Sequence, residues 1–340
     1  MQLDSRTMKK RRFFIRNIEA ASHLEFFLVS AVAAILVIRG FLALTGYPQL
    51  GDDNLHIAHM LWGGLFMLIS IIIMFTFLSK KAEDIAVVIG GIGFGTFVDE
   101  IGKFITQDND YFYQPSIAII YVVFILIVLT VRFILTRRYY SDIEYLMNAV
   151  HELEEVVLNN LDITAKKRIL KYLKRSNPQD PLVLRLSEIV QSADTIPSPN
   201  TGLFTRLKNL LYLYYRHISL SKWFRPVIGG FFLFQLFVGS SYVVTLIAAE
   251  QRQELSFTEW AALSSSMLSA LLVVWGVITI RRSRLKAYKI FERAILVSIF
   301  LTQVFVFYEE QFGALVGLTA NLLIILALRF MIEREKESTV

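Results

Sequence analysis

The chain has 340 residues, of which 55% are hydrophobic and 19% are charged, with a mean hydropathy of +0.52 and a formal net charge of +6. Soluble domains carry about 25% charged residues, so this composition excludes a disordered chain, a fibrous protein and an ordinary soluble enzyme. The sequence contains no cysteine, which excludes disulfides, thiolate metal sites and cysteine nucleophiles. In so apolar a chain, the positive excess indicates contact with anionic lipid at the cytoplasmic face and does not indicate binding to nucleic acid.

Eight apolar stretches are long enough to cross a bilayer, since about 20 residues at ~1.5 Å per residue cover the hydrocarbon core. They cover residues 25–45, 56–78, 84–106, 115–136, 226–248, 260–280, 292–308 and 312–331. The third stretch contains charged residues and the seventh is short, so these two depart most from a typical span. The sequence predicts an all-α, polytopic membrane protein with about eight transmembrane helices in two four-helix halves.

Lys and Arg residues in the short loops predict the orientation of the spans. The N-terminal tail and the loops after spans two and six are basic, whereas the alternate loops at 46–55, 107–114, 249–259 and 309–311 contain only Arg252. Both termini are therefore expected in the cytoplasm, with the protein in the cell membrane. The expected segments are a basic cytoplasmic tail (1–24), spans one to four (25–136), a cytoplasmic helical insert (137–225), spans five to eight (226–331) and a cytoplasmic C-terminal tail (332–340).

The insert has 14 Lys or Arg and 9 Asp or Glu residues, so it carries +5 of the net charge. Apolar residues recur at alternating spacings of three and four over 142–161, and they are Ile143, Leu146, Val150, Leu153 and Val157. This stripe is either the seam of a homodimer or a surface that packs on neighbouring helices. Asp162 and Asp180 are expected helix caps, and residues 203–222 are expected to form an interfacial helix before span five. The insert is also a candidate surface for a cytoplasmic protein partner.

Ionisable residues inside spans are costly, so each is a functional candidate. Those expected in the outer half of the bilayer or at its outer surface are Arg39, His56, His59, Asp99, Glu100, Lys103, Glu309 and Glu310. Asp99 and Lys103 have the i, i+4 spacing of an ion pair, whereas Glu100 points about 100° away, and Arg39 is a candidate partner from another helix. These charges either form a neutral lock between spans or an ion or proton site in which Glu100 exchanges protons.

His56 and His59 are three residues apart and share one helix face. Asp99 or Glu100 could complete a set of two histidines and one carboxylate for Zn, Fe or Mn, with Asp99 as the favoured ligand. The alternative is that the two histidines lie at the membrane interface and face water. A second motif, Gly91 and Gly95, has the small-xxx-small spacing that permits close helix packing, and Gly63 and Gly64 are the expected complementary surface.

Three functions fit these patterns. The first is cation- or proton-linked transport or conduction, with Asp99 and Glu100 as the ion or proton site and with Lys103 and Arg39 as counter-charges. The second is a membrane-embedded, metal-dependent enzyme that acts on an outer-leaflet lipid or envelope substrate, with Glu100 as the general base. The third is a non-catalytic sensor or scaffold that signals through the insert.

Overall fold

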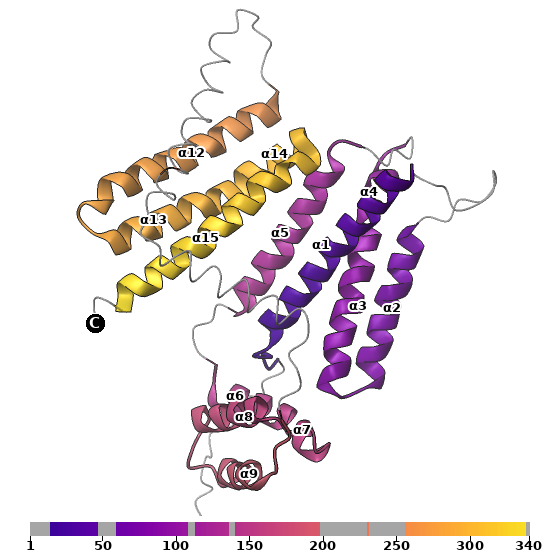
Figure 1. Ribbon diagram of the computed structural model, residues 1–340, viewed down its shortest axis with the longest axis vertical. Coiled ribbons are helices and arrows are strands. Elements are labelled where there is room, and N and C mark those ends of the chain that lie inside the picture. Colours follow the sequence, from indigo (N-terminus) through magenta and orange to yellow (C-terminus); the bar gives the residue numbers. More distant parts are fainter. Residues whose placement is uncertain are drawn as a thin grey trace, which may run out of the picture. The chain divides into compact units, whose positions relative to one another are not determined.

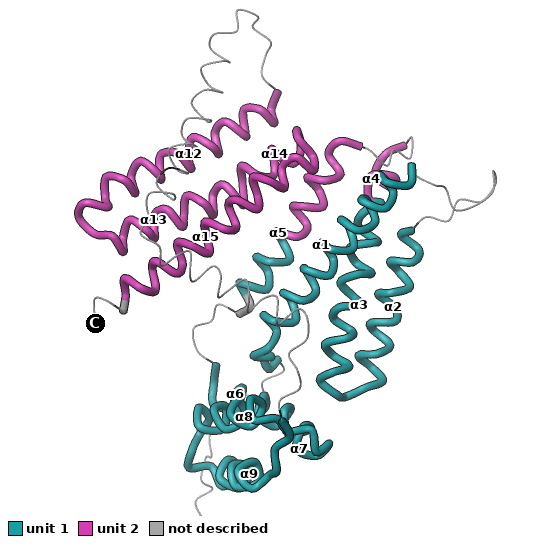
Figure 2. The backbone as a smooth tube through the Cα atoms, viewed as in Figure 1, with its two compact units in different colours: residues 1–100, 126–201 teal, residues 101–125, 202–340 magenta. Residues whose placement is uncertain are grey.

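The computed structural model describes residues 14–46, 59–107, 113–135, 140–197, 230 and 256–337. Over these residues the protein is helical, and the β-structure is limited to an isolated bridge between Asp162 and Ile196. The all-α prediction is therefore confirmed. The chain divides into two compact units, residues 1–100 with 126–201 and residues 101–125 with 202–340 (Figure 2).

The first unit contains three long helices, which are α1 (Ala20–Thr45), α2 (His59–Thr76) and α3 (Lys80–Asp99) (Figure 1). Helix α3 packs against both α1 and α2. Its glycines permit this, because a side chain at these positions would collide with neighbouring backbone. A Cβ at Gly93 would lie 2.7 Å from Gly63 O, and Cβ atoms at Gly91 and Gly95 would collide with the backbone of α1. The predicted close packing at Gly91 and Gly95 is confirmed, but their partner is α1. The predicted pairing with Gly63 and Gly64 is wrong, because Gly63 packs on Gly93 and Phe97 and Gly64 has no heavy atom within 4 Å of a Cβ placed there.

The first unit also contains a module of four short helices. They are α6 (Asp142–Glu152), α7 (Glu154–Val157), α8 (Ile163–Arg175) and α9 (Pro181–Ser192). Asp162 and Asp180 accept hydrogen bonds from the first amides of α8 and α9, which confirms both predicted caps. The apolar stripe at 142–161 is divided between α6 and α7. Leu146 and Leu153 pack on the module core around Ile169, whereas Val157 is exposed. The homodimer seam remains a prediction.

The second unit is built mainly from the C-terminal third of the chain. Its described helices are α4 (Ile101–Ile105), the first part of α5 (Ser116–Leu135), α12 (Phe257–Ile280), α13 (Arg284–Val297), the π-helical turn η1 (Ser298–Thr302), α14 (Gln303–Glu310), the 3₁₀ turn η2 (Gln311–Gly313) and α15 (Ala314–Glu337). The chain turns back at Gln311, whose φ is 50°, so α15 returns against α13 (Figure 1). Phe291, Ile295 and Leu328 form the centre of the core between these helices.

Five helical stretches among the described residues are long and apolar enough to cross a membrane. They are Ala20–Thr45, His59–Thr76, Ser116–Phe133, Phe257–Ile280 and Arg284–Lys336. The last contains 53 residues and the turn at Gln311, so it holds both of the expected spans 292–308 and 312–331. Helix α3 is not among the five, since both of its ends carry charged residues. The expected span 226–248, the interfacial helix 203–222 and most of the tail 1–24 lie outside the described residues.

Candidate functional site

Four ionisable side chains from the three long helices of the first unit meet in one polar cluster, which consists of Arg39, His59, Asp99 and Glu100. Arg39 lies near the end of α1, His59 begins α2, Asp99 ends α3 and Glu100 follows it. Arg39 Nε donates to Asp99 Oδ1 at 2.5 Å, and its Nη2 donates to the Asp99 carbonyl oxygen at 3.3 Å. Arg39 thus holds Asp99 by its side chain and its backbone, whereas the sequence suggested Arg39 as a partner for Glu100.

His59 lies between the two carboxylates. Its Nε2 is 3.3 Å from Asp99 Oδ2, and its Nδ1 is 3.3 Å from Glu100 Oε1. The other oxygen of Glu100, Oε2, accepts a hydrogen bond of 2.8 Å from the backbone N–H of Met60. This amide belongs to the first turn of α2, where N–H groups have no partner within the helix and the helix dipole favours negative charge.

The backbone of α3 directs both carboxylates into the cluster because the helix ends between them. Asp99 is its last residue, Glu100 has φ −89° and ψ 9°, and α4 begins at Ile101. The expected span 84–106 is therefore interrupted at Glu100. Lys103 lies on α4, beyond this break, and its pairing with Asp99 remains a prediction.

Burial makes the charge of this cluster significant. The side chains of Asp99 and Glu100 are 0% and 1% exposed, whereas those of Arg39 and His59 are 15% and 24% exposed. A buried charge without a counter-charge is strongly unfavourable, so the number of protons in the cluster matters. Arg39 balances the charge of Asp99, and a protonated His59 would lie against both carboxylates.

The position of the His59 ring offers a place for a proton. A neutral imidazole has one N–H group and can donate to one carboxylate, whereas an imidazolium donates to two. His59 has a carboxylate oxygen within 3.3 Å of each ring nitrogen. With a proton on both ring nitrogens of His59, the four named side chains together carry no net charge. Chemically, this arrangement can hold a proton between His59 and either carboxylate.

The expected metal set is incomplete in the part of the chain that the structure describes. His56 lies outside it, and no group of three or more His, Asp or Glu residues within it is arranged to hold a metal ion. His59 and Asp99 are close together, but the Arg39 guanidinium lies on Asp99 Oδ1 and would repel a cation there. The metal-dependent enzyme therefore remains a prediction from the sequence, because its ligand set requires His56.

The two glutamates expected at the same depth belong to the second unit. Glu309 and Glu310 end α14, and both are exposed. Glu309 Oε1 accepts a hydrogen bond of 3.3 Å from Thr258 Oγ1. The assignment of Glu309 and Glu310 to the ion site remains a prediction.

Sequence reasoning missed a second polar region, where the module meets the opposite ends of α1 and α3. Lys80 Nζ is 2.5 Å from Glu19 Oε2, Arg168 Nε is 2.7 Å from Glu152 Oε2, and Arg168 Nε is also 3.5 Å from Glu19 Oε1. The Lys80 backbone N–H also donates to Glu154 Oε1 at 2.5 Å. The residues come from distant parts of the sequence, and their spacing along the chain contains no signal for this pairing.

Beside this region, Arg16 anchors the segment before α1 to the module. Arg16 donates to both oxygens of Glu144, at 2.7 and 3.0 Å, and this hydrogen-bonded pair lowers the pKa of Glu144 to about 2. Asn148 accepts a hydrogen bond from the Ile18 N–H and donates one to the Arg16 carbonyl. Polar contacts therefore hold the segment before α1 to the module, and Ile18 adds an apolar contact with the module core.

No protein-family model, curated protein or solved structure matches this chain. The described apolar helices are those expected of an α-helical membrane protein.

Proposed function

We propose that this protein carries out proton- or cation-linked transport or conduction, with the cluster of Arg39, His59, Asp99 and Glu100 as its proton-binding site. The observation that carries the proposal is the position of His59 between two fully buried carboxylates. Asp99 and Glu100 bind the proton together with His59, and Arg39 supplies the fixed positive charge.

The expected topology gives this site a functional position. If the basic loops lie in the cytoplasm, the cluster lies in the outer half of the bilayer, below loops that contain Asp52, Asp53, Asp108 and Asp110. Acidic residues at that surface raise the local concentration of cations near the site. Lys103, Glu309 and Glu310 are further candidates for the path on the strength of their sequence positions.

The test is proton flux into liposomes that contain the purified full-length protein, driven by a pH gradient and read from an internal pH-sensitive dye. Asp99→Asn and Glu100→Gln keep the shape of each side chain but remove its charge, so each is expected to lower the flux at least about tenfold, in the range of a positioned acid or base. Glu292→Gln is the matched control, because Glu292 pairs at 3.3 Å with the half-exposed Arg329 and lies outside the cluster. Unchanged flux in both cluster variants would overturn the proposal.

A second candidate is a membrane sensor that signals through the helical module. It is favoured by the fact that α1 and α3 carry the polar cluster at one end and the ion pairs to the module at the other. Removing the charge of Asp99 with Asp99→Asn is then expected to speed amide hydrogen exchange in α6 and α8 of the full-length protein, whereas Glu292→Gln is not. Identical exchange in all three proteins would exclude this coupling.

A further inference from the structure

The basic residues of α8 fall into two sets with different surroundings. Three of them have partners within the protein: Lys166 donates to the carbonyls of Gln191 and Ala193, Arg168 pairs with Glu152, and Arg175 bonds to Tyr145. The other three, Lys167, Lys171 and Lys174, are exposed, and no ion pair of theirs is found among the described residues.

The exposed lysines lie on one face of α8. Their spacing of four and three residues places them in a row, and Ile163, which is 50% exposed, begins the same row four residues earlier. The opposite face of α8 is buried in the module core through Ile169 and Leu173. The row therefore points away from the module core. The three lysine charges take no part in the core or in the ion pairs found among the described residues.

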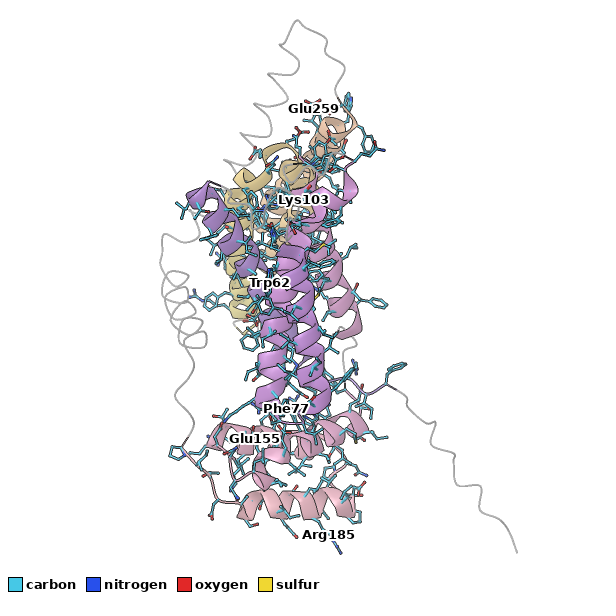
Figure 3. The ribbon with its side chains drawn as sticks, turned by 90° about the vertical axis from the view of Figure 1, so that its right-hand side faces the viewer. Trp62, Phe77, Lys103, Glu155, Arg185 and Glu259 are labelled. Carbon is cyan, nitrogen blue, oxygen red and sulfur yellow. The ribbon has the colours of Figure 1, made fainter. Side chains whose placement is uncertain are left out.

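The position of α8 shows what this row faces. Arg168, next to Lys167 in sequence, reaches Glu19, the residue that immediately precedes the apolar helix α1. Lys171 lies about 60° around the helix from Arg168, because three residues turn an α-helix by about 300°. The row thus adjoins the side of α8 from which Arg168 reaches the start of α1. In Figure 3 the module, on which Glu155 is labelled, lies directly beyond the end of α2 near Phe77.

We propose that Lys167, Lys171 and Lys174 form a binding surface for the headgroups of anionic lipids in the leaflet where α1 begins. Each lysine near an anionic leaflet is attracted electrostatically and raises the partition coefficient onto the membrane about fivefold. Ile163 adds an apolar side chain to the same face, as in helices that lie at a membrane interface. A lipid surface fits better than a soluble acidic partner because the row adjoins the start of a membrane-spanning helix. This inference does not depend on the proposed transport function.

The test uses the absence of native cysteine, which allows a single fluorescent label on the full-length protein. Thr164→Cys places the label beside the lysine row, and Arg185→Cys places a control label on α9, at the end of the module away from the bundle (Figure 3). Each protein is placed in nanodiscs of phosphatidylcholine, with or without phosphatidylglycerol, and its label is exposed to the neutral quencher acrylamide.

Phosphatidylglycerol is expected to lower quenching at residue 164 at least about twofold and to leave residue 185 unchanged. Replacing the three lysines by Gln is expected to abolish this protection, replacing them by Arg to retain it, and high salt to weaken it. Equal quenching in both lipids, or protection that persists in the Gln variant, would overturn the proposal. Protection that requires an added acidic polypeptide or nucleic acid instead of lipid would also overturn it and would assign the row to a soluble partner.

Discussion

Replacing Gly95 with Ala would test the close packing that supports the polar cluster. A Cβ at this position would lie 2.8 Å from the carbonyl carbon and 2.9 Å from the Cα of Ala31 on α1. Both are backbone atoms, so no side-chain rotation relieves the collision and the helices must separate. Overpacking of this kind costs about 1–3 kcal/mol. Because Asp99 lies one turn further along α3, the same shift is expected to loosen its bond to Arg39.

Gly64→Ala is the matched control. It is the same substitution in the interior of α2, and no heavy atom lies within 4 Å of the added Cβ. Removing glycine from a helix stabilises it by roughly 0.5–1 kcal/mol, so this variant is expected to be as stable as the parent or slightly more stable. The assay is unfolding of the purified protein in mixed micelles by increasing amounts of dodecyl sulfate. Equal stability of the Gly95 variant and the parent, or equal loss in both variants, would refute the packing argument.

Three further predictions concern polar contacts. Arg39→Met leaves Asp99 buried without its main counter-charge and is expected to destabilise the protein by about 3–5 kcal/mol in the same assay. The double variant Arg39→Met with Asp99→Leu is expected to lose less stability, because no buried carboxylate remains at residue 99. An equal loss in the single and double variants would contradict this explanation. The stability that Glu144 supplies is present above its ordinary pKa of 4.5 and is lost as the pH falls toward about 2. This loss, measured as faster hydrogen exchange in α6, should be absent in Glu144→Gln, and an identical pH response in the two proteins would count against the ion pair with Arg16. Asn148→Ala removes a donor and an acceptor for the segment before α1 and should cost about 1–3 kcal/mol, seen as faster proteolysis near residue 18; an unchanged cleavage rate would contradict it.

Local chemistry made much of the fold predictable. Hydropathy identified the apolar stretches, and short-range rules identified the caps at Asp162 and Asp180, because each cap depends on residues only a few positions apart. The pairing of Arg39 with a carboxylate of α3 could be inferred because an arginine inside a span requires a counter-charge.

The rest depended on contacts between distant segments. The break at Glu100 was missed because the sequence has no proline there, and the role of Glu100 depends on the first amide groups of α2, 40 residues away. The docking of the module on α1 and α3 involves pairs separated by more than 70 residues, such as Lys80 with Glu154. Charged residues are common on the surface of any helix, so the sequence does not show which of them pair with one another.

The proposed site requires that His59 shares a proton with Asp99 or Glu100. Nitrogen-15 NMR of histidine-labelled protein in lipid bilayers tests it directly, since the chain has five histidines and His59→Gln identifies the signals of His59. At a single fixed pH, Glu100→Gln is expected to shift the ring nitrogen signals of His59, because Nδ1 then faces an amide instead of a carboxylate, whereas Glu292→Gln is expected to leave them unchanged. Signals of His59 that are the same in Glu100→Gln and in the parent protein would overturn the shared site.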